Sequence, residues 1–161
     1  RQRFVTLHDG GHFEYGLIKL LLGKADEARV IFEELQLRME APEVQNDGRA
    51  HAGLAMAYFD LGRPGESDAQ LATLIDGFGN AEPRSVAMVH AWRNEKDTAF
   101  EWLDRYAAQD NPGQTLLLLD PAFRNLRDDP RWQSLRESVG FSEQVLATLD
   151  FPVELLAQYR D

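Results

Sequence analysis

The sequence predicts an all-α protein, because apolar residues recur at helical spacing along most of the chain and strand-like alternation is nearly absent. Among the 161 residues, only the stretch RFVTL at positions 3–7 alternates as a half-buried strand does. The helix expected over residues 25–37 has one apolar stripe, with acidic residues lying off it. That stripe consists of Ala28, Ile31, Phe32 and Leu35.

A second amphipathic helix is expected over residues 96–107. Its apolar positions lie three or four residues apart, and Glu101, Asp104 and Arg105 point the other way. The apolar positions are Ala99, Phe100, Leu103 and Tyr106. Each of the two helices therefore has one face to bury against a neighbour.

Composition limits the classes of function. A chain of 161 residues is expected to form one domain and to bury roughly 70% of its unfolded surface, so it needs no staples. It has no cysteine, which excludes disulfides and thiolate metal sites. The net charge of -10 repels phosphate backbones and anionic lipid, so nucleic acid is not an expected partner.

The chain also carries no signal for a membrane or a compartment. Apolar runs such as GLIKLLLG are far shorter than the roughly 20 residues of a membrane span, so no direct insertion is expected. The sequence begins with Arg1 and has no leader-like pattern, which we interpret as a piece of a longer polypeptide. The compartment stays open at this point, with the cytoplasm favoured over the periplasm.

Three turn signals divide the chain into helix pairs. Gly23, Gly62 and Asn94 each follow one expected helix and precede the next, at separations of 39 and 32 residues. Glycine, and less often asparagine, adopts the left-handed conformation that ends a helix. Paired helices joined at these residues are therefore the expected building blocks, and an unrelated helical bundle is the alternative.

The residues around these turns resemble the tetratricopeptide repeat, whose period is about 34 residues. The family has a small residue and an aromatic in the first helix of each pair, then an alanine and a large apolar residue in the second. The matching residues are Tyr15, Gly16, Ala28 and Phe32 in the first unit, Leu54, Ala55, Tyr58, Ser67 and Leu71 in the second, and Val86, Ala87, His90, Ala99 and Leu103 in the third. The chain departs from the pattern at Lys19, where a tyrosine is usual, and at Ser67, where an alanine is usual. The resemblance implies antiparallel hairpins stacked in a right-handed α-solenoid, with units at residues 12–40, 47–80 and 83–110 and a short-helix capping tail at 112–161.

The stretch from Val86 to Gly140 has a narrower resemblance. AWRNEKDTAFEWLDRYAAQD followed by LLLLDPAFRNLRDDPRWQSLRESVG is similar to the C-terminal end of tetratricopeptide regions behind bacterial signalling modules, namely adenylate cyclases, serine/threonine kinases and winged-helix regulators. None of those modules is present in the 161 residues. The resemblance implies a non-catalytic scaffold that binds a protein or peptide, or a sensory-regulatory domain, within a larger bacterial signalling protein.

Two Asp-Pro pairs, at Asp120 and Asp129, are expected to begin short helices. An aspartate before proline fits an N-cap followed by the first helical residue, a cap worth about 1 kcal/mol. Aromatic and leucine residues then share one face and close the open end of the stack. These are Phe123 and Leu126 after the first pair, and Trp132 and Leu135 after the second. The alternative, a carboxylate pair for acid–base or metal chemistry, lacks a nearby histidine or nucleophile at motif spacing.

Other motifs give no catalytic prediction. HDGGH sets His8 and His12 at a spacing that suits a metal on a helix, but the glycines between them favour a flexible entry loop. DGFGN at residues 76–80 lacks the rest of a dinucleotide fingerprint and is expected to end a helix. The sequence has no G-x-S-x-G, Walker-type or H-E-x-x-H motif. We therefore expect no enzyme, no cofactor and no bound metal.

The tetratricopeptide resemblance implies a partner-binding groove lined by the first helix of each pair. Aligning the units on their turns places Phe13, Leu17 and Leu20 there from the first unit, together with Ala52 from the second. The residues most expected to bind the partner are Arg49, Met56, Phe59, Arg84, Met88 and Trp92. Two arginines on the wall of an acidic protein favour a ligand with a carboxylate or an acidic side chain.

Two other functions remain open at this point. The chain is expected either to dimerise through its outer face or tail and so control an attached enzyme, or to sense a small ligand in a pocket between hairpins. A deep enclosed polar pocket would favour the sensor.

Overall fold

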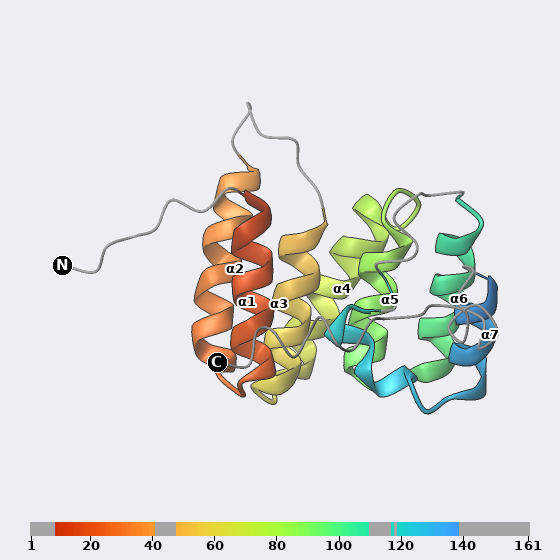
Figure 1. Cartoon of the computed structure of the whole chain (residues 1–161). Helices are drawn as coiled ribbons and strands as arrows, with labels where there is room; N and C mark the ends of the chain where they lie inside the picture. The colour runs from red at the N-terminus through yellow and green to blue at the C-terminus, as the bar shows by residue number, and fades with distance from the viewer. Residues whose placement is uncertain (1–8, 41–47, 110–116, 118, 139–161) are drawn as a thin grey trace, which may run out of the picture.

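Every regular element in the computed structural model is a helix within the residues it describes, which are 9–40, 48–109, 117 and 119–138. Consecutive helices pack against each other as antiparallel pairs (Figure 1). The elements are α1 (Asp9–Leu21), α2 (Ala25–Met39), α3 (Arg49–Asp60), α4 (Pro64–Phe78), α5 (Pro83–Trp92), α6 (Lys96–Ala107), the 3-10 helix η2 (Pro121–Leu126) and α7 (Pro130–Ser138). The all-α prediction is confirmed for the described residues.

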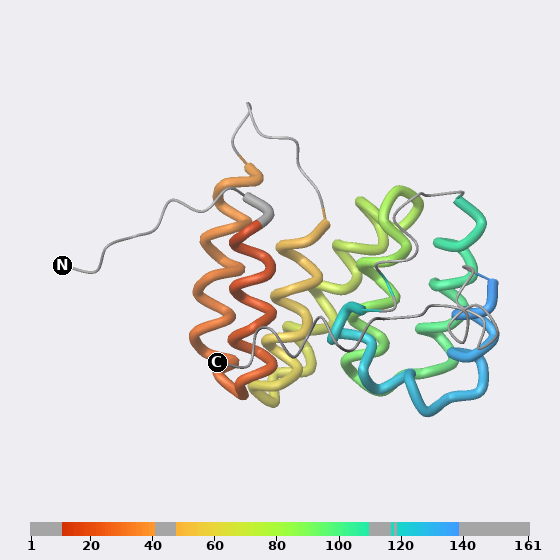
Figure 2. The backbone as a smooth tube through the Cα atoms, in the orientation of Figure 1, coloured from red at the N-terminus to blue at the C-terminus, as the bar shows by residue number. Residues whose placement is uncertain are grey.

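The backbone forms three hairpins in chain order, α1–α2, α3–α4 and α5–α6, placed side by side (Figure 2). The second helix of one hairpin packs against the first helix of the next, so α2 contacts α3 and α4 contacts α5. First helices also contact each other, α1 with α3 and α3 with α5. The far end of the row is covered by η2 on α5 and by α7 beside α6 (Figure 1).

The three hairpin turns have the same geometry. Gly23, Gly62 and Asn94 have φ values of 71°, 69° and 63°, in the left-handed region. At each turn this residue donates its N–H to the carbonyl three residues before it. The following residue donates its own N–H to the carbonyl five residues before it, which completes a Schellman motif. The predicted turn positions are therefore confirmed.

Close packing within and between hairpins depends on small residues. Ala28, Ser67 and Ala99, each five residues after its turn, are fully buried. The ring of Phe32 on α2 is also fully buried, between two glycines. A Cβ atom added to Gly16 on α1 would lie 2.5 Å from Phe32 Cε1, and one added to Gly53 on α3 would lie 2.6 Å from Phe32 Cγ. Three helices from two hairpins therefore meet at this ring.

Both Asp-Pro aspartates act as helix caps, as predicted. Asp120 accepts a hydrogen bond from the backbone N–H of Ala122 at 2.9 Å, at the start of η2. Asp129 accepts from the N–H of Arg131 at 3.0 Å, and the Arg131 guanidinium binds the same carboxylate at 2.8 and 2.9 Å. These hydrogen bonds lower the pKa of Asp129 to about 2.

The residues expected to close the end of the row are buried. Phe123 and Leu126 in η2 are fully buried, and Trp132 and Leu135 in α7 are nearly so. The Phe123 and Trp132 rings lie 6.1 Å apart between centroids. The two short helices thus share one apolar interior with the hairpins.

One local prediction was wrong and others cannot be compared. The glycines at positions 10 and 11 were expected in a flexible loop, but α1 begins at Asp9 and contains them. Burial of Phe13, Leu17 and Leu20 against neighbouring helices outweighs the low helix propensity of glycine. The expected end of a helix within 76–80 is confirmed, because α4 ends at Phe78. The possible strand at 3–7, His8 and the tail beyond 138 lie outside the described residues.

No helix in the described part of the chain is long and apolar enough to cross a membrane.

Candidate functional site

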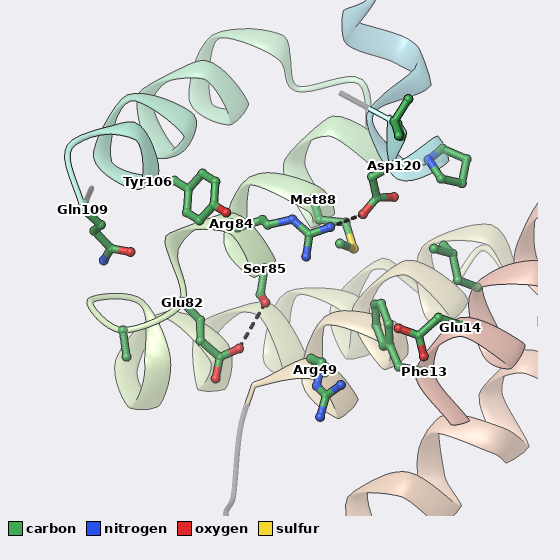
Figure 3. Close-up of a pocket in the computed structure, with 14 residues that line it drawn as sticks. Phe13, Glu14, Arg49, Glu82, Arg84, Ser85, Met88, Tyr106, Gln109 and Asp120 are labelled. Carbon is green, nitrogen blue, oxygen red and sulfur yellow. Dashed lines mark hydrogen bonds and ion pairs between the residues drawn. The ribbon is translucent and has the colours of Figure 1, made fainter. Parts of the chain in front are cut away.

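A cavity of about 610 Å³ lies where the first helices of the three hairpins meet the segment before η2 (Figure 3). Its walls come from six parts of the chain. They are Phe13, Glu14 and Leu17 from α1, Arg49 from α3, Arg84, Ser85 and Met88 from α5, Tyr106 and Gln109 at the end of α6, and Leu119, Asp120 and Pro121 before and in η2, with Ala81 and Glu82 completing the lining. The cavity is neither enclosed nor flat, so one side is open to solvent.

Three of the six predicted groove residues line this cavity. Arg49 stands at the first position of α3, and Arg84 and Met88 lie one turn apart on α5. Phe13 and Leu17, predicted from the first unit, line it as well. The structure therefore brings these five residues together from three separate helices.

The other three predicted residues lie elsewhere. Met56 is fully buried in the core. Phe59 is 41% exposed on α3, with the Arg93 guanidinium 5.9 Å from its ring centre. Trp92 is buried, and its indole N–H donates to Asp60 at 2.9 Å. These three are the positions nearer the C-terminal ends of α3 and α5, and none of them lines the cavity.

Charges in the cavity are largely paired within the chain. Arg84 donates to the carboxylate of Asp120, which is 10% exposed, and Figure 3 shows its guanidinium directed at that group. Glu82 accepts from the backbone N–H of Gly48 at 2.8 Å and from the Ser85 hydroxyl at 3.1 Å. Glu82 thereby joins the start of α3 to the start of α5 across the cavity wall.

Several lining residues were missed from the sequence. Tyr106 and Gln109 belong to a second helix, and only first helices were expected to line a groove. Leu119 is 75% exposed, although it is a large apolar residue. A single exposed leucine is ordinary on a protein surface, and its place in the cavity wall depends on how the segment before η2 folds against α5, so the sequence carries no signal for it. The Arg84–Asp120 pair joins residues 36 positions apart, so spacing could not predict it.

Trp92, the last residue of α5, packs against residues of η2 and not into the cavity. The Arg124 guanidinium lies 4.2 Å from the centre of the Trp92 ring, and the Asn125 side chain donates to the carbonyls of Ala91 and Trp92 at 3.1 and 3.3 Å. Partial burial raises the pKa of the Asp60 carboxyl, and the hydrogen bond from Trp92 opposes that rise. These contacts explain why Trp92 supports the capping helix and does not face the cavity.

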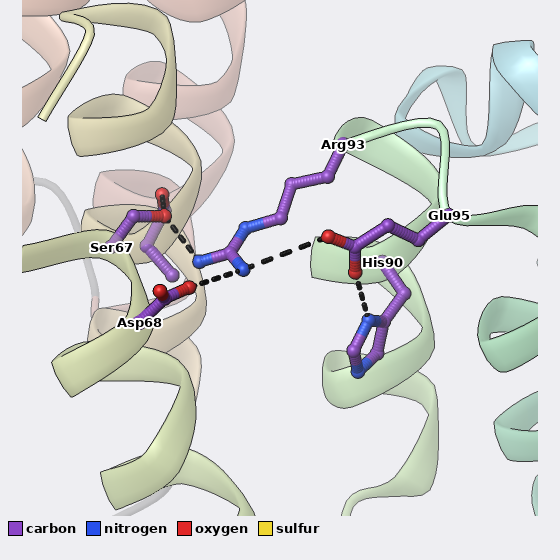
Figure 4. Close-up of polar contacts among 6 residues, drawn as sticks. Ser67, Asp68, His90, Arg93 and Glu95 are labelled. Atoms are coloured by element: carbon purple, nitrogen blue, oxygen red, sulfur yellow. Dashed lines mark hydrogen bonds and ion pairs between the residues drawn. The ribbon is translucent and has the colours of Figure 1, made fainter. Parts of the chain in front are cut away.

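A second polar cluster connects the last two hairpins (Figure 4). The Arg93 side chain, 6% exposed, reaches from the end of α5 to Asp68 at 2.8 Å and to the hydroxyl of Ser67 on α4. Glu95 binds His90 on the preceding helix and lies 3.9 Å from Arg93. The Arg93 backbone belongs to the end of α5, and its guanidinium binds two residues of α4. This cluster therefore fixes one hairpin against the next and leaves little access for a ligand.

The described residues contain no cluster of three or more histidine, aspartate or glutamate side chains arranged to hold a metal ion. Comparisons with protein-family models, curated proteins and solved structures find no match to the chain. The described residues thus form a row of antiparallel helical hairpins with an open cavity on the face of the first helices.

Proposed function

We propose that this chain is a tetratricopeptide-like α-solenoid that serves as a non-catalytic binding scaffold within a larger bacterial signalling protein. Three features support the repeat assignment: the identical Schellman turns, the buried small residues five positions later, and the contact of each second helix with the next first helix. Repeats of this kind bury a core only by stacking, which matches the observed order of contacts.

The observation that carries the binding role is the cavity on the first-helix face. A preformed cavity between rigid helices costs a ligand little reorganisation. Its wall includes both apolar groups, such as Phe13 and Met88, and hydrogen-bonding groups, such as Ser85 and Gln109. An extended peptide places side chains of both kinds along one line, so a peptide segment of a partner protein is the ligand we favour.

The charge of the ligand follows from the pairing of Arg84. Its partner Asp120 already occupies the position that a ligand carboxylate would take. An acidic group on the peptide must displace or share that contact. It would also meet the negative charge of Glu14, which lies exposed at the rim. The two arginines therefore favour an acidic residue less strongly than their presence on the wall suggests.

Peptide selection followed by titration tests this function. A random peptide library panned on the chain would supply a binder, whose affinity is measured by fluorescence anisotropy. Leu119→Asp changes an exposed rim residue, and we expect it to weaken binding at least tenfold, or about 1.4 kcal/mol. Leu37→Asp is the matched control, because Leu37 is 68% exposed on α2 and does not line the cavity. Equal affinity of both variants would remove the cavity from the proposal.

A small-molecule sensor is the second candidate, favoured by the cavity volume, which lies in the range of about 300–1,000 Å³ typical of ligand pockets. Such pockets enclose most of their ligand, and this one is open on one side. A thermal-shift screen of small metabolites distinguishes the two, since a sensor gives compounds that stabilise the wild type and not Leu119→Asp.

A further inference from the structure

The first helix of the row exposes an apolar stripe, which we define as Tyr15, Ile18 and Leu22. These side chains are 44%, 50% and 65% exposed. Positions three and four apart share one face of a helix, so the stripe forms a continuous surface along α1 and into its turn. Large apolar residues in such a row, rather than scattered singly, mark a contact surface.

The other hairpins show what covers this face. Measured from the hairpin turns, Tyr15 corresponds to Leu54 on α3 and Val86 on α5. Ile18 corresponds in the same way to Ala57 and Val89. All four of these counterparts are at most 1% exposed.

The covering element in each case is a helix of the preceding hairpin. On α3, Gly53 lies four residues before Ala57 on the same face, and the Phe32 ring of α2 packs against it. On α5 the same role falls to α4. The α1 stripe is therefore the face that a neighbouring helix buries everywhere else in the row, and it continues an interface already used twice.

Among the described residues, the opposite end of the row does not offer a matching free face. There η2 packs on α5, and Arg131 of α7 lies 4.3 Å from the Phe100 ring and 2.9 Å from Asp97 of α6. Head-to-tail stacking of copies would have to displace these contacts. A symmetric contact between two α1 helices displaces none of them, and such two-fold contacts are the commonest kind in oligomers.

We propose that the chain forms a dimer with a second copy of itself through the α1 stripe. An antiparallel pair of α1 helices centred near Ile18 sets Tyr15 of each copy opposite Leu22 of the other. None of the three stripe residues is charged. The nearby Lys19 ammonium, 5.1 Å from the centre of the Tyr15 ring, is already paired with Glu27 at 2.6 Å. Each copy carries a net charge of -10, however, and this repulsion opposes association until salt screens it.

Sedimentation equilibrium of the 161-residue chain tests the proposal. The stripe from Tyr15 to Leu22 spans only about 11 Å of helix, so we expect a reversible monomer–dimer equilibrium with a dissociation constant in roughly the micromolar range or weaker. Association should strengthen as salt is raised from low to moderate concentration. A contact held by ion pairs would weaken instead, and that result would overturn the assignment to the stripe.

Two substitutions and a control locate the interface. Ile18→Lys and Leu22→Lys are both at exposed positions, so each should fold, as circular dichroism can verify, and each should weaken dimerisation at least tenfold. Val30→Lys is the control and should leave dimerisation unchanged. Val30 is 53% exposed on α2, not on α1, and lies about 200° around α2 from the buried Ala28, so it points away from the core. A wild-type chain that stays monomeric at high concentration would exclude a second copy as the occupant. A dimer unaffected by both stripe substitutions would overturn the proposal as well. Neither measurement involves the cavity, so each outcome is independent of peptide binding.

Discussion

Replacing Gly53 with alanine tests the packing on which the row of hairpins depends. The new Cβ would lie 2.6 Å from Phe32 Cγ, where carbon atoms normally stay about 3.5–4.0 Å apart. The ring has little room to retreat, because it also packs against Gly16 of α1 and is fully buried. The clash must therefore be relieved by moving α2 or α3.

The expected magnitude comes from two opposing effects. Overpacking of a core costs about 1–3 kcal/mol, and confinement of Phe32 on two sides places this case near the upper value. Alanine gains about 1 kcal/mol over glycine inside a helix. Gly53→Ala should thus lower the free energy of unfolding by about 2 kcal/mol. With a urea dependence of about 2 kcal/mol per molar, the midpoint should fall by about 1 M.

Urea unfolding followed by far-ultraviolet circular dichroism measures this change. Gly77→Ala is the matched control, since an added Cβ there meets no atom within 4 Å, and it should stabilise the protein slightly. In a Phe32→Leu background the penalty of Gly53→Ala should shrink, because the smaller side chain leaves room. If Gly53→Ala proves as stable as Gly77→Ala, the close approach of the first two hairpins described above is incorrect.

Two further substitutions test a turn and a cap. Asn94→Gly should raise the free energy of unfolding and Asn94→Ala should lower it, by roughly 1 kcal/mol each, because only glycine adopts the observed φ of 63° without strain. Thermal unfolding of the two variants measures this, and equal stability would contradict the left-handed turn. For Asp129, the folded pKa of about 2 lies below the unfolded value, so its contribution to stability is present above about pH 4 and is lost as the pH falls through 2. Wild type should therefore lose more stability than Asp129→Asn over that interval in urea titrations, and parallel losses would show that the carboxylate is not held by Arg131.

The hairpins were predictable because local chemistry alone determines their turns and stripes. A left-handed residue between two amphipathic segments has few alternatives to a helix end, so Gly23, Gly62 and Asn94 could be identified without any contact information. The Asp-Pro caps were predictable for the same reason. The flexible loop expected at the glycines at 10 and 11 was wrong, because helix propensity is a weak signal where neighbouring residues are buried by other helices.

The cavity was only partly predictable. Arg49, Arg84 and Met88 line the cavity, as the alignment of the first helices suggested, and their role in binding a partner stays a prediction. Met56 and Met88 occupy the same position before their turns, yet only Met88 lines the cavity, because Met56 is fully buried in the core. Trp92 is buried against the capping helix η2. Such burial depends on contacts between residues far apart in sequence, and the periodic pattern of apolar residues carries no information about those contacts.

The wall of the cavity is assembled from residues as distant in sequence as Phe13 and Pro121, with contributions from every hairpin between them. No single hairpin can present this surface alone. A molecule bound there would contact the beginning and the end of the row at once, so its binding energy would add to the stability of the whole assembly rather than to one part. Occupancy would then make the separate units melt together, and a partner protein could report through that shared rigidity to any domain joined to either end.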